Sequence, residues 1–219
     1  SLRTPGCLGA NVTIPHKERA FELATWRDEV SSRLMATNTL YVRNGELHAT
    51  STDGEGFVAS LQESHAGLQL QGAHVVVLGA GGSARSIIGA LLDHGVARIG
   101  IINRTAERVL ALQKSFGPLL HHIGKQQEAE GLARCSILVN TTSLGMERQP
   151  ELDFDVGQLA PKCLVVDIVY TPLKTRLLRR AEQRGLPVVG GLGMLLHQAV
   201  RGFELWYGVR PQVTEELKS

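Results

Sequence analysis

Residues 75–92, VVVLGAGGSARSIIGALL, contain the segment that decides the fold. A valine-rich run predicts a buried strand, the glycines predict a tight turn, and the apolar spacing after them predicts a helix. Gly79, Gly81 and Ala84 match the G-x-G-x-x-G/A pattern of dinucleotide-binding proteins. In this pattern the first glycine makes the turn, the second lets the backbone approach a pyrophosphate, and the third residue must be small for helix–strand packing.

The strand–turn–helix context therefore predicts a dinucleotide site. Free N–H groups and a partial positive charge at the start of the helix attract phosphates. We assign this role to Gly79, Ala80, Gly81, Gly82, Ser83 and Ala84. A glycine turn that serves only helix packing is the alternative.

The chain around this segment alternates between two patterns. Short runs rich in Val and Ile predict strands buried on both faces, at 74–79, 98–103, 135–140, 164–170 and 186–191. Helical periodicity separates them, at 83–95, 105–117 and 173–185. Strands and helices in this order indicate right-handed βαβ units. We therefore predict an α/β fold with a Rossmann-type parallel sheet over residues 67–193.

Residues 1–66 have a different pattern, with short strands inside 37–50. The Asn44-Gly45 pair predicts a tight hairpin between two of them. Near the C-terminus, 193–208 has apolar residues on more than one side of a predicted helix. We predict a smaller α/β substrate-binding lobe over 1–66, to which a tail helix in 194–219 returns.

The end of the second predicted strand indicates which dinucleotide binds. An NAD site usually has an Asp or Glu roughly 20 residues after the glycine turn, and this carboxylate accepts a hydrogen bond from the ribose 2′-hydroxyl. Here the strand ends in Asn103, Arg104 and Thr105, and Arg108 follows one helical turn later. Guanidinium groups suit a dianionic 2′-phosphate, so we predict NADP. Two solvated arginines at a helix start are the alternative.

Composition narrows the class of protein. The 219 residues are 43% hydrophobic and 20% charged, which is typical of a soluble globular protein. A net charge of +2, with 5% aromatic residues, gives no reason to expect a nucleic acid or membrane partner. Cys135 and Cys163 flank apolar runs without metal-ligand spacing, which favours buried thiols in a reducing cytoplasm. We expect a cytoplasmic protein that needs no metal.

Eight segments, in order along the chain, resemble the shikimate dehydrogenases and their quinate/shikimate dehydrogenase relatives. They are NVTIPHK (11–17), ATNTLY (36–41), STDGEGF (51–57), LGAGGSAR (78–85), NRT (103–105), VNTTSLGM (139–146), VVDIVYTP (165–172) and GGLGMLLHQAVRGFELW (190–206). The resemblance implies a small substrate lobe and a Rossmann lobe facing each other across a cleft. It also implies hydride transfer between NADP and a hydroxylated cyclohexene carboxylate, in a monomer or homodimer.

The resemblance also implies roles for individual residues. Lys17 and Asp53 correspond to the catalytic pair, which handles the proton at the reacting oxygen. Substrate contacts are implied for Thr13, Asn38, Tyr170 and Gln198. Further cofactor contacts are implied for Thr142, Ser143, Ile168, Gly191 and Met194. Capping, core packing or solvent contact is the structural alternative for such residues.

The sequence departs from the family in several places. Ser51 stands where the family usually has Asn, and Met35 stands where it usually has Gly. Gly190 stands where an Asp is common. The family also begins with a strand and helix whose Ser-x-Ser pair binds the substrate carboxylate, and no such unit precedes Ser1 here. We expect that a leading segment is missing from this sequence. Two alternatives follow: an enzyme that prefers quinate or another polyol acid, and a non-catalytic NADP-binding module.

Overall fold

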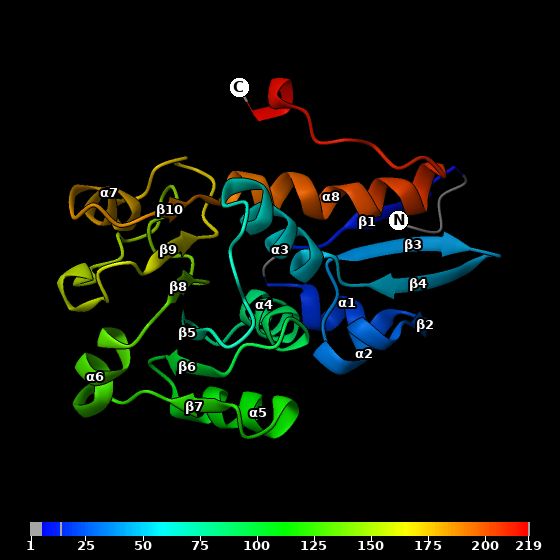
Figure 1. The fold of residues 1–219 in the computed structure, drawn as a ribbon. Coiled ribbons are helices and arrows are strands. Elements are labelled where there is room, and N and C mark those ends of the chain that lie inside the picture. The colour runs from blue at the N-terminus through cyan, green and yellow to red at the C-terminus, as the bar shows by residue number, and fades with distance from the viewer. Residues whose placement is uncertain (1–5, 14, 219) are drawn as a thin grey trace.

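The computed structural model describes residues 6–13 and 15–218, and these residues form two β-sheets with helices around them (Figure 1). The larger sheet is parallel, with the strand order β10-β9-β8-β5-β6-β7. Its strands are β5 His74–Leu78, β6 Arg98–Ile102, β7 Leu120–His122, β8 Ile137–Asn140, β9 Leu164–Asp167 and β10 Val188–Val189. This is the 3-2-1-4-5-6 order of dinucleotide-binding domains, so the predicted Rossmann-type fold is confirmed.

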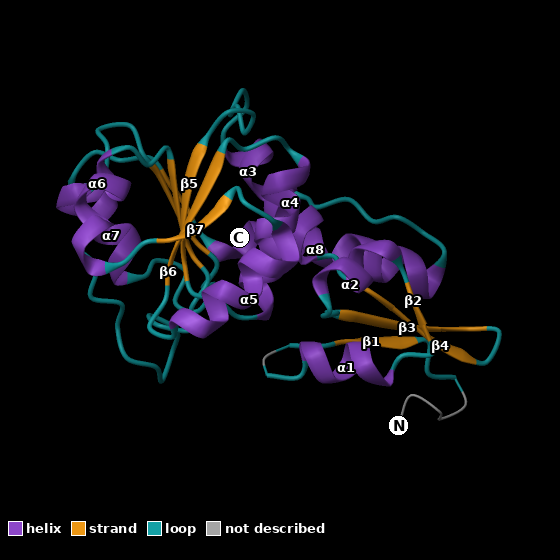
Figure 2. Cartoon of the chain, turned by 90° about the horizontal axis from the view of Figure 1, so that it is seen from below, coloured by secondary structure: helices purple, strands orange, loops and turns teal. Residues whose placement is uncertain are grey.

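Helices cover both faces of this sheet, with α4 and α5 on one side and α6 and α7 on the other (Figure 2). Their bounds are α4 Gly82–Asp93, α5 Ala106–Phe116, α6 Glu128–Ala133 and α7 Arg176–Gln183. Val75 and Val77 of β5 pack into one core, and Val76 and Leu78 pack into the other. Burial on both faces explains why this strand has no polar alternation.

The smaller sheet has the order β1-β3-β4-β2. Its strands are β1 Gly9–Asn11, β2 Trp26–Arg27, β3 Thr39–Arg43 and β4 Glu46–Thr50. β3 is antiparallel to β1 and to β4, whereas β2 is parallel to β4. Asn44 and Gly45 have φ values of 55° and 77°, as a tight hairpin turn requires. The predicted hairpin is therefore confirmed.

A long helix connects the two sheets. α8 Gly191–Tyr207 starts at the larger sheet and runs along α3 Asp53–Ser64 to β3 (Figure 1). The α3–α8 contact is close at Gly56, where an added Cβ would lie 2.5 Å from the backbone N of Gln198. The smaller sheet also carries α1 Lys17–Leu23 and α2 Glu29–Leu34. Among the described helices, none is both long and apolar enough to span a bilayer.

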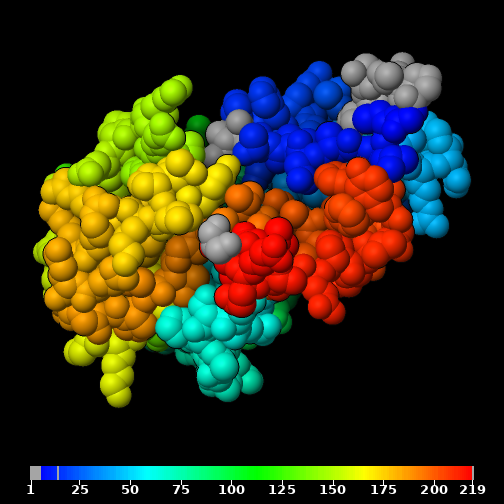
Figure 3. Space-filling model, turned by 90° about the horizontal axis from the view of Figure 1, so that it is seen from above, coloured from blue at the N-terminus to red at the C-terminus, as the bar shows by residue number. Residues whose placement is uncertain are grey.

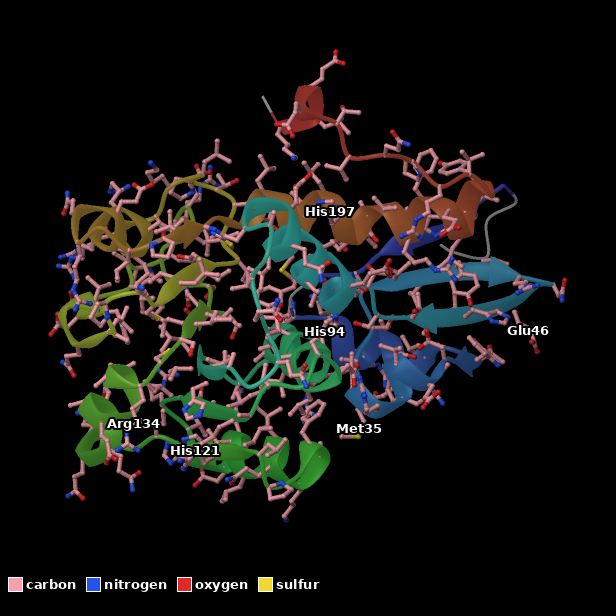
Figure 4. The ribbon with its side chains drawn as sticks, in the orientation of Figure 1. Met35, Glu46, His94, His121, Arg134 and His197 are labelled. Atoms are coloured by element: carbon pink, nitrogen blue, oxygen red, sulfur yellow. The ribbon has the colours of Figure 1, made fainter. Side chains whose placement is uncertain are left out.

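Residues after α8 fold back over it, as the red atoms in Figure 3 show. The turn Glu215–Lys218 reaches α3, where the Lys218 Nζ lies 2.7 Å from a Glu63 carboxylate oxygen. His197 of α8, labelled in Figure 4, places its Nε2 3.1 Å from the other oxygen of Glu63. These contacts tie the C-terminal residues to the helix pair.

The structure corrects the predicted bounds of the tail helix. The tail helix was predicted within 194–219, but α8 begins at Gly191 and ends at Tyr207. It ends there because Gly208 adopts a left-handed conformation, with φ 71°, that stops a helix. Ser219 and residues 1–5 lie outside the described residues.

The sequence patterns also missed β1 and β2 of the smaller sheet and β7 of the larger sheet, and they overextended other strands. β7 contains the short sequence LHH with two half-buried histidines, a pattern too short to separate from a loop. The apolar runs at 135–140, 164–170 and 186–191 exceed their strands because Cys135, Val169 and Leu186 are buried outside the ladder. Burial, and not strand pairing, produced those parts of the pattern.

Direct side-chain contacts join the smaller lobe to α4 of the larger sheet. Arg33 of α2 makes a two-pronged ion pair with Asp93 of α4, at 2.7 and 2.6 Å. Ser51, at the departure from the family motif, lies before α3 and places its Oγ 3.2 Å from the Oγ of Ser86 on α4. Both serine side chains are buried, so the substituted residue makes an inter-lobe hydrogen bond.

We expect Ser51→Ala to lower the free energy of unfolding by about 0.5–1.5 kcal/mol, the usual net value of one hydrogen bond. Ser86 keeps a second partner, the Gly82 carbonyl at 3.4 Å, which limits the loss. Urea unfolding measures the change, with Ser32→Ala on the exposed side of α2 as the control. If both variants lose the same amount of unfolding free energy, the Ser51–Ser86 hydrogen bond has no specific role.

Candidate active site

Lys17 and Asp53 form a buried ion pair at the starts of two helices. Lys17 is the first residue of α1, and Asp53 is the first residue of α3. The Lys17 Nζ donates to the Asp53 Oδ2, and the two residues are only 8% and 5% exposed. The start of α3 favours a carboxylate, because the partial positive charge of the helix lies there.

Asn38 holds the other oxygen of Asp53. Its Nδ2 donates to the Asp53 Oδ1 at 2.9 Å and to the Gln198 Oε1 at 2.6 Å. The backbone N–H of Thr52 donates to the Asn38 Oδ1 at 2.8 Å, which fixes the orientation of the amide. Side chains from α1, α3, α8 and the segment before β3 therefore meet in one network.

The glycine-rich turn adjoins this network. The Lys17 Nζ lies 3.4 Å from the Ser83 Oγ, on the first turn of α4. A Cβ added at Gly82 would lie 3.5 Å from the Lys17 Cδ, so glycine leaves space beside the lysine stem. The ion pair of the smaller lobe and the turn of the larger sheet are thus in contact.

The turn has the geometry that a phosphate site requires. Gly79 has φ +104°, and a Cβ there would lie 2.8 Å from the Thr141 Oγ1. At Gly81 an added Cβ would meet nothing within 4 Å, so the backbone is open on that side. Gly81 also caps α4 without a side-chain hydrogen bond. The N–H groups of the first turn are therefore available to an anion.

A basic cluster follows β6. The Asn103 Nδ2 donates to the Thr105 carbonyl at 2.8 Å, and Thr105 caps α5 without using its hydroxyl. Arg104 and Arg108 are exposed, and neither has an ion-pair partner among the described residues. Two unpaired guanidinium groups and a free hydroxyl fit a dianionic phosphate better than a ribose diol.

The loops after β8 and β9 are held by a buried polar pair that the sequence patterns did not reveal. The Asn140 Nδ2 donates to the Asp167 Oδ1 at 2.9 Å, and the Thr175 hydroxyl donates to the Asp167 Oδ2 at 2.7 Å. Burial raises the pKa of the Asp167 carboxyl, and the hydrogen bonds to it oppose that shift. Asn140 at the end of one apolar run and Asp167 inside the next were the signal for this pair.

This pair positions the remaining residues of the predicted cofactor site. The N–H and the hydroxyl of Thr142 donate to the Asn140 Oδ1 at 3.0 and 2.7 Å, and half-buried Ser143 follows in the same loop. A Cβ at Gly191 would lie 2.2 Å from the Ile168 carbonyl oxygen, so α8 starts directly against the chain after β9. Met194, one turn later, is 9% exposed.

Two of the predicted substrate residues lie outside the network. Thr13 and Tyr170 are exposed, and their side chains make no hydrogen bond within residues 6–13 and 15–218. Ile14 of the NVTIPHK segment lies outside the described residues. Conversely, Thr52 belongs to the network but was not assigned, although its place between Ser51 and Asp53 was a signal.

The departure at Met35 has a structural cost. Met35 ends α2 in the left-handed conformation, with φ 50°, and its side chain is half-exposed (Figure 4). Glycine, the usual family residue, adopts this conformation without the strain that a Cβ introduces.

The sequence matches two family models. Residues 60–169 match "Shikimate / quinate 5-dehydrogenase", and residues 191–215 match "Shikimate 5'-dehydrogenase C-terminal domain". A curated relative, the shikimate dehydrogenase (NADP(+)) of Rhizobium meliloti strain 1021, is 51% identical over 216 residues. That alignment covers 99% of this chain and 75% of the relative.

Two solved structures are similar as well. Shikimate 5-dehydrogenase from Thermus thermophilus, in complex with NADP(H) and shikimate, has a TM-score of 0.85 at 34% identity, covering 96% of this chain and 77% of that chain. Quinate dehydrogenase from Corynebacterium glutamicum, in complex with NAD, has a TM-score of 0.89 at 29% identity. That match covers 99% of this chain and 78% of the quinate dehydrogenase chain. This chain therefore belongs to the shikimate dehydrogenase family.

Proposed function

We propose that the chain is an NADP-dependent shikimate dehydrogenase, which transfers hydride reversibly between NADPH and 3-dehydroshikimate to give shikimate. The observation that carries the proposal is the buried Lys17–Asp53 pair in contact with Ser83 of the glycine-rich turn. A binding module has no physical need for a buried ion pair at that position, because burying charges costs free energy.

The chain's residues fit the proposed cofactor. The open backbone at Gly81 and the first turn of α4 would hold its diphosphate, and Arg104 with Arg108 would hold its 2′-phosphate. Ile168, Gly191 and Met194 would line the nicotinamide side. When bound, the nicotinamide supplies or accepts the hydride.

Lys17 handles the proton in this mechanism. Reduction of a ketone develops negative charge on its oxygen, and the Lys17 ammonium donates a hydrogen bond and then a proton to it. Asp53 holds the ammonium through its Oδ2, while Asn38 holds the Asp53 Oδ1 at 2.9 Å. In the oxidation direction the same pair accepts the hydroxyl proton.

Four side chains would contact the substrate. Asn38 and Gln198 already lie in the network around Asp53, where their amides offer donors and acceptors to ring hydroxyls. Thr13 and Tyr170 are exposed and complete the proposed set from two further segments. Their hydroxyl groups match the polar, uncharged part of a cyclic polyol acid.

Steady-state assays of the purified protein test the function. We expect turnover of shikimate with NADP to exceed turnover of quinate, and NADP to be used in preference to NAD. Faster turnover of quinate would favour the alternative suggested by the similarity to the Corynebacterium glutamicum quinate dehydrogenase. Binding of NADPH without turnover of either acid would favour a non-catalytic module.

We also propose that the protein acts in the cytoplasm as a monomer or homodimer, without a nucleic acid partner. All three cysteines are free thiols, and Cys135 and Cys163 are buried 3.7 Å apart at their sulfur atoms. Free thiols this close suit a reducing compartment. Light scattering of the purified protein would give the oligomeric state.

A further inference from the structure

Arg85, on the first turns of α4, has a buried nitrogen with no partner. Its Nη1 is inaccessible to solvent and makes no hydrogen bond in the described part of the chain. Two arginines at α7 differ from it: Arg180 pairs with Asp153 at 3.0 Å, and Arg184, which caps the helix, donates to the Leu159 carbonyl at 2.8 Å. A buried, unpaired cationic nitrogen is unfavourable, so this group is placed to receive an anion.

The position of Arg85 on the helix shows which surface it serves. Gly82 and Ser86 face Lys17 and Ser51 of the smaller lobe. Ala84, Ile87 and Ile88 are buried against the larger sheet. Gly89, one turn after Arg85, lies between α2 and α5, because its added Cβ would be 3.0 Å from the Leu34 Cδ2 and 3.6 Å from Phe116. Arg85 lies between the direction of Gly89 and that of Ile88, which packs on the sheet, and so lies toward α5.

The direction of the side chain follows from helix geometry. Cα–Cβ bonds in an α-helix tilt toward its N-terminus, so a long side chain at Arg85 covers the preceding turn. On α4 that direction leads to the glycine-rich turn, at the carboxyl edge of the larger sheet. At the same edge α5 begins with Thr105 as its cap, and Arg108 lies on its first turn.

We propose that Arg85 is a third cationic ligand of the cofactor's 2′-phosphate, together with Arg104 and Arg108, and so helps to select NADP over NAD. This inference rests on the proposed NADP-dependent function and deepens it. A 2′-phosphate carries up to two negative charges and three acceptor oxygens, which can accept bonds from several guanidinium groups. In the ligand-free protein the Arg85 Nη1 has no partner among the described residues.

Binding of two nucleotides that lack nicotinamide tests the proposal by calorimetry. Adenosine 2′,5′-bisphosphate contains the 2′-phosphate, and 5′-AMP does not. Arg85→Met keeps an apolar stem and removes the charge. We expect it to lower the affinity for the bisphosphate about tenfold, as loss of one charge-assisted hydrogen bond does. Its effect on 5′-AMP should be small, and Arg85→Lys should recover part of the lost affinity.

Thermal unfolding without ligand separates this role from a structural one. Arg85→Met removes an unpaired buried charge, so the Tm should stay the same or rise, whereas a structural arginine would give a lower Tm. Arg98→Met is the matched control, because Arg98 lies at the opposite, amino end of β6 and contacts His121 at 3.2 Å. It should leave the affinity for the bisphosphate unchanged.

The results distinguish failure of this inference from failure of the proposed function. If the wild type binds the bisphosphate and Arg85→Met binds it equally well, Arg85 has no part in the site and the inference is wrong. Equal weakening of 5′-AMP and the bisphosphate would also refute it, since the contact would not involve the 2′-phosphate. If the wild type binds neither the bisphosphate nor NADPH, the proposed function itself fails.

Discussion

Lys17→Ala lowers kcat by about 10²–10⁴-fold, the range that a general acid–base group supplies, and leaves NADPH affinity close to that of the wild type. The lysine nitrogen lies against Asp53 and Ser83, where it can reach a substrate oxygen, and no other residue of the described network carries an ammonium group. Stopped-flow reduction and a fluorescence titration of NADPH measure the two quantities. Near-normal kcat would end the assignment of Lys17 as proton donor.

Loss of the lysine also removes the cation next to a buried carboxylate, so its effect on stability has to be measured separately. Breaking a buried pair from one side typically costs about 3–5 kcal/mol, because the remaining charge is uncompensated. The double variant Lys17→Met/Asp53→Asn removes both charges and should recover much of the stability but none of the activity. Lys162→Ala, at an exposed lysine before β9, should behave as the wild type.

Arg104→Ala lowers the affinity for NADPH about 10- to 100-fold and barely changes the affinity for NADH. The reason is the loss of charge-assisted hydrogen bonds to the 2′-phosphate, worth roughly 1.5–3 kcal/mol, and NADH has no such phosphate. Paired titrations of the two cofactors measure the difference. Arg104 is exposed and unpaired among the described residues, so we expect little change in the Tm of the free protein.

The control for this variant is Arg43→Ala, at the exposed end of β3 beside the hairpin. It should leave both affinities unchanged. Equal losses for NADPH and NADH in Arg104→Ala would mean that Arg104 shapes the loop after β6 without contacting the phosphate. A wild type that prefers NADH would show that the strand end was misinterpreted.

The amino-acid sequence by itself determined the features that depend on neighbouring residues. The strand, turn and helix at 75–92 could be predicted because Gly79 needs a positive φ and the apolar residues repeat with strand and helix periods. The hairpin at Asn44-Gly45 followed from the same kind of local preference. The absence of an acid after β6, beside Arg104, indicated the cofactor for the same reason.

Only the tertiary structure decided which distant residues meet. Asn38 and Gln198 are 160 positions apart, and their hydrogen bond exists because α8 crosses from one sheet to the other. Asn140 and Asp167 pair because β8 and β9 are neighbours, and no spacing along the chain encodes that distance. The unpaired nitrogen of Arg85 is the same kind of fact, since whether a polar atom has a partner depends on everything packed around it.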